Sequence, residues 1–496
     1  MGAKKENNKS DASGIHRAKL WEIGFYALNN TSTNIYMMIF MYVSYFLVGI
    51  VGTTVVFAGS ITTIMRMWDG VTDPLIGYVV DKTNSKFGKN RPFILIGNLI
   101  LLVTSFIIFK ITPSLPMVAR LPFYIILYMF YIIGYTCQCV VTKSAQTCLT
   151  NDPSQRPIFA MFDTIYNALV FAIMPVIITS VLIPKFGGNE AFNNPDFFVG
   201  LWSYLAPLSL FFAIIAIIGL WRKDRVEYYG TGVVKRVTFK DYWEVLKSNR
   251  AIQMLVVSAS SDKLSMSMRS NSIIYVMLYG IICGNYALYG SMSALSTVPT
   301  IIVTLLLMNF VARKMGQKAA MLVGTWGGII TAILFFFLFL FGDPTTFSFT
   351  NISFFTVAFV VLFIVMSGFS NMSSNIVIPM TADCADYEVY RSGKYVPGLM
   401  GTLFSFVDKM ISSLAGMFVS VMIAAIGFKT AQPTPDTPYT SGIFWVTMAC
   451  FLGAPVVGWI CNVIAMKFYP LTQEKMAEIQ ERIAEIKAKA KAEAGA

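Results

Sequence analysis

Long apolar stretches recur along the whole chain, and each is long enough to cross a lipid bilayer as a helix. A transmembrane helix needs roughly 20 mostly apolar residues. Only 13% of the 496 residues are charged, against about 25% in soluble domains. Twelve stretches meet the required length, at residues 24–50, 54–80, 92–112, 120–146, 157–184, 197–221, 252–282, 287–311, 318–342, 351–380, 397–427 and 441–467. This pattern predicts an all-α membrane protein with twelve transmembrane helices.

The lysine and arginine residues concentrate in alternate loops. They lie before the first stretch and after the second, sixth and eighth. By the positive-inside bias, we expect these loops and both termini to be cytoplasmic, in the plasma membrane or in the inner membrane if the source is bacterial. Contact with anionic membrane lipid accounts for the net charge of +12, so the basic balance does not indicate a nucleic-acid partner.

A polar segment at residues 222–250 separates six spans from six more. We expect a cytoplasmic leader at 1–20, helical halves at 21–221 and 251–468, and an amphipathic cytoplasmic tail at 469–496. Two six-helix halves joined by a central loop are the major facilitator fold, in which the halves rock around a solute near the membrane midplane. We expect the protein to work as a monomer.

The chain lacks the sequence signatures of catalysis. It contains no metal-ligand cluster, nucleophile elbow or glycine-rich phosphate loop, and its one histidine, His16, lies in the leader. These observations argue against an enzyme and against a bound cofactor.

Three charges interrupt the second apolar stretch. Arg66, Asp69 and Asp73 are spaced so that they share one helical face. A charge at bilayer depth costs at least a few kcal/mol, so it persists where it is paired, hydrated or bound to something that passes through. The pattern therefore indicates a transporter. The alternative is that Arg66 neutralises Asp69 as a structural pair.

Four segments together resemble one family, the glycoside-pentoside-hexuronide:cation symporters. Residues 68–74, W-D-G-V-T-D-P, are similar to the family's helix 2 pattern, and residues 85–92, S-K-F-G-K-N-R-P, resemble the basic turn after it. Residues 382–388, A-D-C-A-D-Y-E, resemble an acidic box between helices 10 and 11. Lys409 falls where the family has a helix 11 lysine.

The resemblance implies a secondary active transporter that carries a sugar, glycoside or hexuronide together with a cation by alternating access. It assigns the coupling-cation site to Asp69 and Asp73. Because hard cations prefer several oxygen ligands, Thr72 and Thr136 are candidate neutral ligands if the ion is Na⁺ or Li⁺. If the ion is H⁺, one carboxylate is sufficient.

The chain also departs from the family at positions that bind sugar. Where melibiose carriers of the family present carboxylates from helices 1 and 4, this chain has Thr31 and Cys139. A helix 4 tryptophan is replaced by Lys143 and a helix 5 arginine by Asp163. We expect Lys143 and Asp163 either to pair across helices or to contact the substrate.

Polar residues in several spans are further substrate candidates. Tyr26, Asn30 and Asn34 recur at helical spacing, although polar packing between helices gives the same pattern. In the seventh span, Arg269 either contacts substrate or joins a salt-bridge network. The full candidate set is Tyr26, Asn30, Asn34, Lys143, Asp163, Arg269 and Lys409. Its positive charge favours an anionic cargo such as a hexuronide, and an amphipathic or lipid-like cargo is the alternative.

The basic turn after the second span is a candidate gate. We expect Gly88, Lys89 and Arg91 to form a cytoplasmic contact with acidic helix ends such as Asp152.

Overall fold

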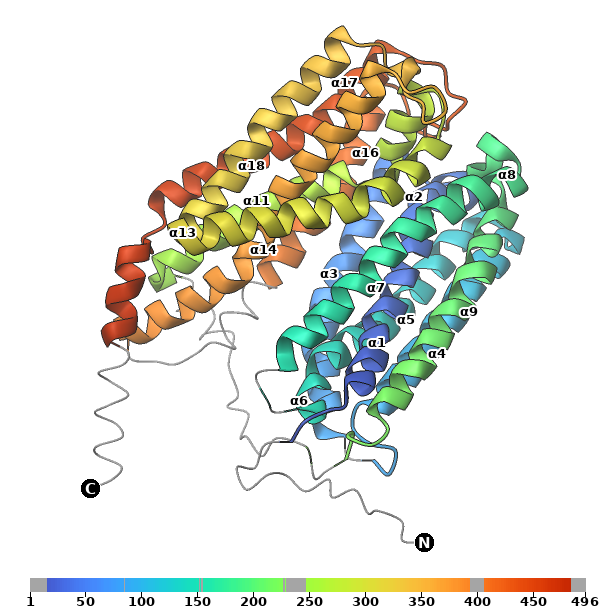
Figure 1. The fold of residues 1–496 in the computed structure, drawn as a ribbon. Coiled ribbons are helices and arrows are strands. Elements are labelled where there is room, and N and C mark those ends of the chain that lie inside the picture. The colour runs from blue at the N-terminus through green and yellow to red at the C-terminus, as the bar shows by residue number, and fades with distance from the viewer. Residues whose placement is uncertain are drawn as a thin grey trace, which may run out of the picture. The chain divides into compact units, whose positions relative to one another are not determined.

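The computed structural model describes residues 16–83, 85–150, 152, 155–225, 228, 247–392 and 406–482. The regular secondary structure of this part of the chain consists of helices (Figure 1), apart from an isolated bridge between Ser85 and Gly88. The predicted all-α class is therefore confirmed.

The chain divides into two compact units. One comprises Met1–Thr53 and Trp68–Val233, and the other comprises Thr54–Met67 and Val234–Ala496. The division passes through the helix that carries the three charges, α3 (Val55–Lys82).

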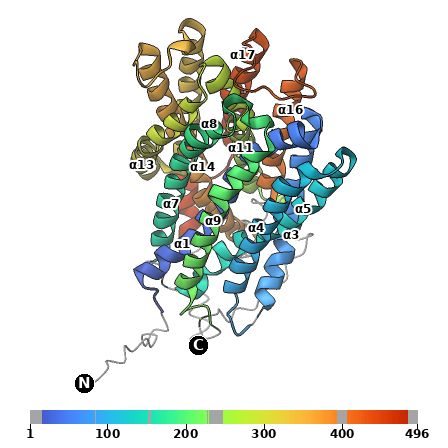
Figure 2. The same cartoon turned by 90° about the vertical axis from the view of Figure 1, so that its right-hand side faces the viewer.

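In the first unit, the long helices run alongside one another, as Figures 1 and 2 both show. Helix α1 packs on α5, α7 and α9, and α4 packs on α5 and α9. The helices of this unit besides α3 are α1 (Leu20–Ile39), α2 (Val43–Tyr45), α4 (Arg91–Ile111), α5 (Met117–Ser144), α6 (Gln146–Leu149), α7 (Arg156–Ile177), α8 (Ile183–Lys185) and α9 (Pro195–Leu220). Short π- and 3₁₀-segments join them: η1 (Phe40–Tyr42), η2 (Phe46–Val51), η3 (Thr112–Ser114), η5 (Ile178–Leu182) and η6 (Gly188–Asn193).

In the second unit, α11 packs on α14, α16 and α18, and α13 packs on α14 and α18. Its helices are α11 (Arg250–Arg269), α12 (Ser272–Tyr275), α13 (Ala287–Phe341), α14 (Phe354–Ser392), α16 (Ala415–Ala425), α17 (Ser441–Met448) and α18 (Ala454–Phe468). The short segments are η8 (Val276–Ile282), η9 (Pro344–Thr346) and η10 (Ala449–Gly453). Gly316, with φ +80°, breaks α13 into the two helices that the apolar pattern predicts.

Ten helices in the described residues are long and apolar enough to cross a membrane. Helices α3 and α11 have 28 and 20 residues, but charged and polar side chains lower their hydropathy. The count of twelve spans therefore remains a prediction. The two uncounted helices are those on which the sequence places Asp69, Asp73 and Arg269.

Two boundaries differ from the sequence prediction. The expected seventh span is broken at Asn271, whose side chain accepts a hydrogen bond from the Ile273 N–H and so begins a new helix. The acidic box at 382–388 lies within α14 and not in a connection between helices, because that helix continues to Ser392.

Close packing positions the helices that carry the candidate residues. A Cβ atom at Gly97 on α4 would lie 2.9 Å from the Gly134 carbonyl oxygen on α5, and one at Gly134 would lie 2.8 Å from the Gly97 carbonyl oxygen. Only glycine allows this approach. Elsewhere in the unit buried rings interlock, with Phe46 5.2 Å from Phe109 and 5.1 Å from Phe198 between centroids.

Candidate functional site

The predicted cation ligands Asp69, Thr72 and Thr136 lie together in the first unit, between α3 and α5. The Thr136 hydroxyl donates to Asp69 Oδ1 at 3.0 Å, and it lies 3.0 Å from the Thr72 hydroxyl. Thr72 Oγ1 also donates to the Asp69 carbonyl oxygen at 3.1 Å. Asp69 is 9% exposed and both threonines are buried. The result is a buried cluster of oxygen atoms around one carboxylate.

This cluster has the chemistry that a small hard cation needs. The hydrogen bonds bring together oxygen atoms from a carboxylate, two hydroxyls and a carbonyl. Asp73 lies one turn further along α3 and is half-buried. Pro74 lacks an N–H, so it removes the intrahelical donor to the Gly70 carbonyl. The residues present therefore fit a Na⁺ or Li⁺ ion, and Asp69 alone fits a proton.

A ladder of polar contacts joins α1 to α7. Asn30 Nδ2 donates to Asp163 Oδ1 at 2.7 Å, and one turn further Asn34 Nδ2 donates to Asn167 Oδ1 at 2.8 Å. All four side chains are half-buried. The structure thus brings three predicted substrate residues together on one face. Asn167 was missed by the sequence reasoning, although its position four residues after Asp163 is a visible signal.

Tyr26 does not belong to this ladder. It is 2% exposed, and its hydroxyl lies 2.8 Å from the Val141 carbonyl oxygen and 2.7 Å from that of Thr142. The hydroxyl is engaged by the backbone of α5, which favours the alternative of polar packing between helices. The substrate role of Tyr26 stays a prediction.

The expected ion pair between Lys143 and Asp163 is not formed in the described structure. Asp163 accepts its hydrogen bond from Asn30 instead, and Lys143 is exposed on α5. The second alternative, that these residues contact substrate, stays a prediction.

In the second unit, Arg269 ends α11 as a buried cation. It is 3% exposed, with its guanidinium carbon 5.1 Å from the Phe363 ring centre and 4.9 Å from that of Phe451. Its Nη2 donates to Ser367 Oγ at 3.4 Å, while Nη1 has no hydrogen-bond partner. The predicted salt-bridge network is absent at this residue in the described structure, and the two rings cover it. Lys409, also in this unit, is half-buried.

The candidate gate binds Asp224, an acid that the sequence analysis did not name. Asp224, fully buried after α9, accepts hydrogen bonds from the backbone N–H groups of Lys89, Asn90 and Arg91 at 3.2, 2.9 and 2.9 Å. Arg91 Nε lies 3.5 Å from Asp224 Oδ2. Gly88 has φ +98° and leaves no room for a Cβ atom beside this carboxylate. The sequence does contain a signal for Asp224, because it is the one acidic residue in the basic segment 222–225.

Asp152, the predicted partner of the gate, pairs with Arg17 at 2.5 Å. Nearby, the buried Glu22 binds Arg222 at 2.7 and 2.9 Å. Burial and the positive charge of Lys223 lower the pKa of His16 below its ordinary value. These contacts tie the start of α1 to the ends of other helices, which is a structural role.

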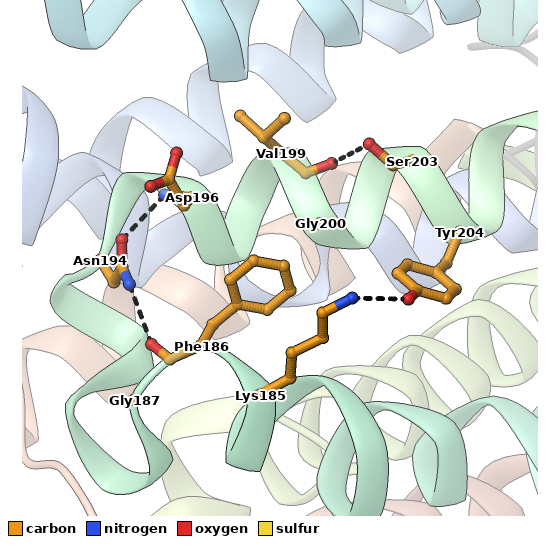
Figure 3. Close-up of a pocket in the computed structure, with 9 residues that line it drawn as sticks. All are labelled: Lys185, Phe186, Gly187, Asn194, Asp196, Val199, Gly200, Ser203 and Tyr204. Carbon is orange, nitrogen blue, oxygen red and sulfur yellow. Dashed lines mark hydrogen bonds between the residues drawn. The ribbon is translucent and has the colours of Figure 1, made fainter.

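A hollow of about 520 Å³ lies at the other end of the first unit, between α8 and α9 (Figure 3). Lys185 Nζ donates to the Tyr204 hydroxyl at 2.9 Å there, as Figure 3 shows. None of the predicted site residues lines it.

Comparison with known proteins gives sequence relatives over nearly the full length. A family model described as MFS/sugar transport protein matches residues 25–473. The inner membrane symporter YicJ of Escherichia coli (strain K12) is 23% identical over 472 residues, 94% of each chain. The glucuronide carrier protein homolog of the same organism is 23% identical, covering 92% of this chain and 93% of the relative. The isoprimeverose transporter of Lactiplantibacillus pentosus is 21% identical, covering 96% and 94%.

Solved structures match the same fold. The nucleoside transporter NupG aligns with a TM-score of 0.58 at 13% identity, covering 91% of this chain and 98% of that one. A bacterial homologue of the iron transporter ferroportin also aligns with a TM-score of 0.58, at 11% identity. Such low identities show the fold alone, which is of the major facilitator type. The chain therefore belongs to the MFS/sugar transport protein family, as its resemblance to the glycoside-pentoside-hexuronide:cation symporters predicted, and it is a multi-pass membrane transporter and not an enzyme.

Proposed function

We propose that the protein is a secondary active symporter that carries a sugar, glycoside or hexuronide together with Na⁺, Li⁺ or H⁺. The observation that supports this most directly is the buried oxygen cluster of Asp69, Thr72 and Thr136. The names of the relatives, a glucuronide carrier homolog and an isoprimeverose transporter, support a carbohydrate as cargo.

For the cation, Asp69 supplies the compensating charge. Its carboxylate oxygens are hard anionic ligands of the kind that Na⁺ and Li⁺ prefer, and a carboxylate also takes up H⁺. The Thr136 hydroxyl, which donates to Asp69, can rotate so that its lone pair faces a metal ion. Asp73 adds a second anionic ligand one turn away.

For the cargo, the ladder on α1 and α7 offers both donors and acceptors. Asn30, Asn34 and Asn167 supply amide groups and Asp163 a carboxylate, a combination that matches the hydroxyls of a sugar. Lys143, exposed and in no ion pair of the described structure, and the free Nη1 of Arg269 add positive charge. A carboxylate on the cargo would satisfy either group, so we favour a hexuronide.

Coupling follows if cation and cargo together favour the conformational exchange that either one alone disfavours. The coupling is then a free-energy difference between states, and alternating access converts the ion gradient into solute accumulation. We also propose that the protein works as a monomer with both termini in the cytoplasm.

The decisive experiment measures uptake into proteoliposomes of a labelled glucuronide and of the matching neutral glucoside, under a Na⁺ gradient or a pH gradient. We expect gradient-driven accumulation, with the glucuronide preferred, and its loss in the variants Asp69→Asn and Asp73→Asn. The control Asp343→Asn changes an exposed carboxylate that caps a short helix, a role that asparagine preserves.

Normal accumulation by both helix variants would reject the cation site. A different result would favour the alternative of a lipid-like cargo: neither solute accumulates under any gradient, and an amphipathic anion is transported instead.

A further inference from the structure

A second buried carboxylate lies in the other unit, on the polar helix α11. Asp262 is 3% exposed. Its Oδ2 accepts a hydrogen bond from the Ser374 hydroxyl of α14 at 3.0 Å, whereas its Oδ1 has no hydrogen-bond partner. The cation site proposed above does not involve this residue.

Two hydrogen-bond donors from neighbouring helices face Asp262. The indole N–H of the fully buried Trp459, on α18, faces the carboxylate but forms no hydrogen bond of good geometry. Helix α18 lies so close that a Cβ atom at Gly458 would meet the Ser265 hydroxyl of α11. The carboxylate is therefore enclosed by α11, α14 and α18.

Among the residues that the structure describes, the charged groups that act on Asp262 are Lys263 and Asp408. Lys263 is exposed and Asp408 is half-buried. Neither forms an ion pair with Asp262 in the described structure, so no paired cation holds the buried carboxylate in its ionised form. Removing an unpaired carboxylate from water costs several kcal/mol. Such a group is stable when it takes up a positive charge.

The chemistry of the neighbours decides which positive charge fits. A metal cation needs several oxygen ligands, whereas Trp459 presents only an N–H donor, which repels a cation. Besides the carboxylate, Ser374 is the single oxygen ligand that the hydrogen bonds place here. A proton needs only the free Oδ1.

We propose that Asp262 is a proton-binding site of the second unit, separate from the oxygen cluster around Asp69. Oδ1 takes one proton from a hydronium ion, leaving water, when the site is open to solvent, and it returns the proton to water on release. In the ionised state, the Ser374 hydroxyl and the Trp459 indole N–H stabilise the anion. This proposal for Asp262 makes no assumption about which solute the protein carries.

Infrared difference spectroscopy of the purified full-length protein in lipid vesicles tests the proposal with the proton alone. During a pH titration we expect a C=O stretching band of a protonated carboxyl group that disappears in Asp262→Asn and persists in Asp69→Asn. Because no cargo or Na⁺ is needed, failure of this test is distinguishable from failure of the proposed symport.

A second variant keeps the test decisive if Asp262→Asn does not fold. Ser374→Ala leaves the acid but removes its hydrogen bond, so we expect the same band to move to higher wavenumber. The control Ser367→Ala, on the same helix, removes a hydroxyl that contacts Arg269 and should leave the band in place. A band that neither Asp262→Asn nor Ser374→Ala alters would overturn the proposal.

Discussion

The hydroxyl of Thr136 occupies a position between the two oxygen atoms that a bound cation would need most, the Asp69 carboxylate and the Thr72 hydroxyl. Each lies 3.0 Å from Thr136 Oγ1. A single side chain on α5 thereby links two candidate cation ligands on α3. Its contribution to ion affinity is separable from that of the carboxylate, because the carboxylate supplies charge and the hydroxyl supplies only a neutral lone pair.

Thr136→Val keeps the volume of the side chain and removes this hydroxyl. For a Na⁺-coupled protein we expect the Na⁺ concentration for half-maximal uptake to rise roughly tenfold, which corresponds to about 1.4 kcal/mol of lost affinity. The measurement is Na⁺-dependent uptake into proteoliposomes at saturating cargo. Thr147→Val is the control, since the exposed Thr147 bonds the Ser144 carbonyl and is not near the cluster. Unchanged Na⁺ dependence would exclude Thr136 as a ligand.

At the scale of an element, the turn between α3 and α4 is built around one carboxylate. Three successive backbone N–H groups, from Lys89 to Arg91, point at Asp224. The Asn90 and Arg91 N–H groups belong to the start of α4, where a helix leaves its first donors without intrahelical partners. The turn is thus fixed to the end of α9 by hydrogen bonds from its backbone, and the Arg91 side chain adds an ion pair to the same carboxylate.

Gly88→Ala tests this arrangement. The left-handed backbone at φ +98° costs an alanine about 1–2 kcal/mol, and its Cβ atom would also collide with Asp224. We expect the thermal unfolding midpoint to fall by roughly 2–4 °C or more, measured by tryptophan fluorescence in detergent.

The matched control for this substitution is Gly77→Ala. Gly77 lies within the helix α3, and a Cβ atom there meets nothing within 4 Å. Alanine is the better helix former, so this variant should be neutral or slightly stabilising. Equal losses of stability at both glycines would contradict the role given to Asp224.

For the whole molecule, the length of the apolar stretches was enough to predict most spans, because a helix in lipid must above all be apolar over roughly 20 residues. It also predicted the break at Gly316 between two spans. The contacts between spans were not predictable in this way. Asp262 and Ser374 are 112 positions apart, and only the packing of α11 on α14 brings them together. Tyr26 is a second example of a contact that was not predictable. Its helical spacing with Asn30 did not reveal that its hydroxyl contacts the backbone of α5.

Symport is a property of the whole molecule, and it has a thermodynamic signature that no single residue carries. If bound cation raises the affinity for cargo by some factor, bound cargo must raise the affinity for cation by the same factor. Couplings of this kind are typically about 1–3 kcal/mol, or roughly 5- to 150-fold. We expect calorimetric titrations of the purified protein to give equal factors in both directions. In Asp69→Asn, cargo binding should persist while its dependence on the cation vanishes. A factor of one in the wild-type protein would mean that cation and cargo bind independently of each other, and the proposed coupling would then fail.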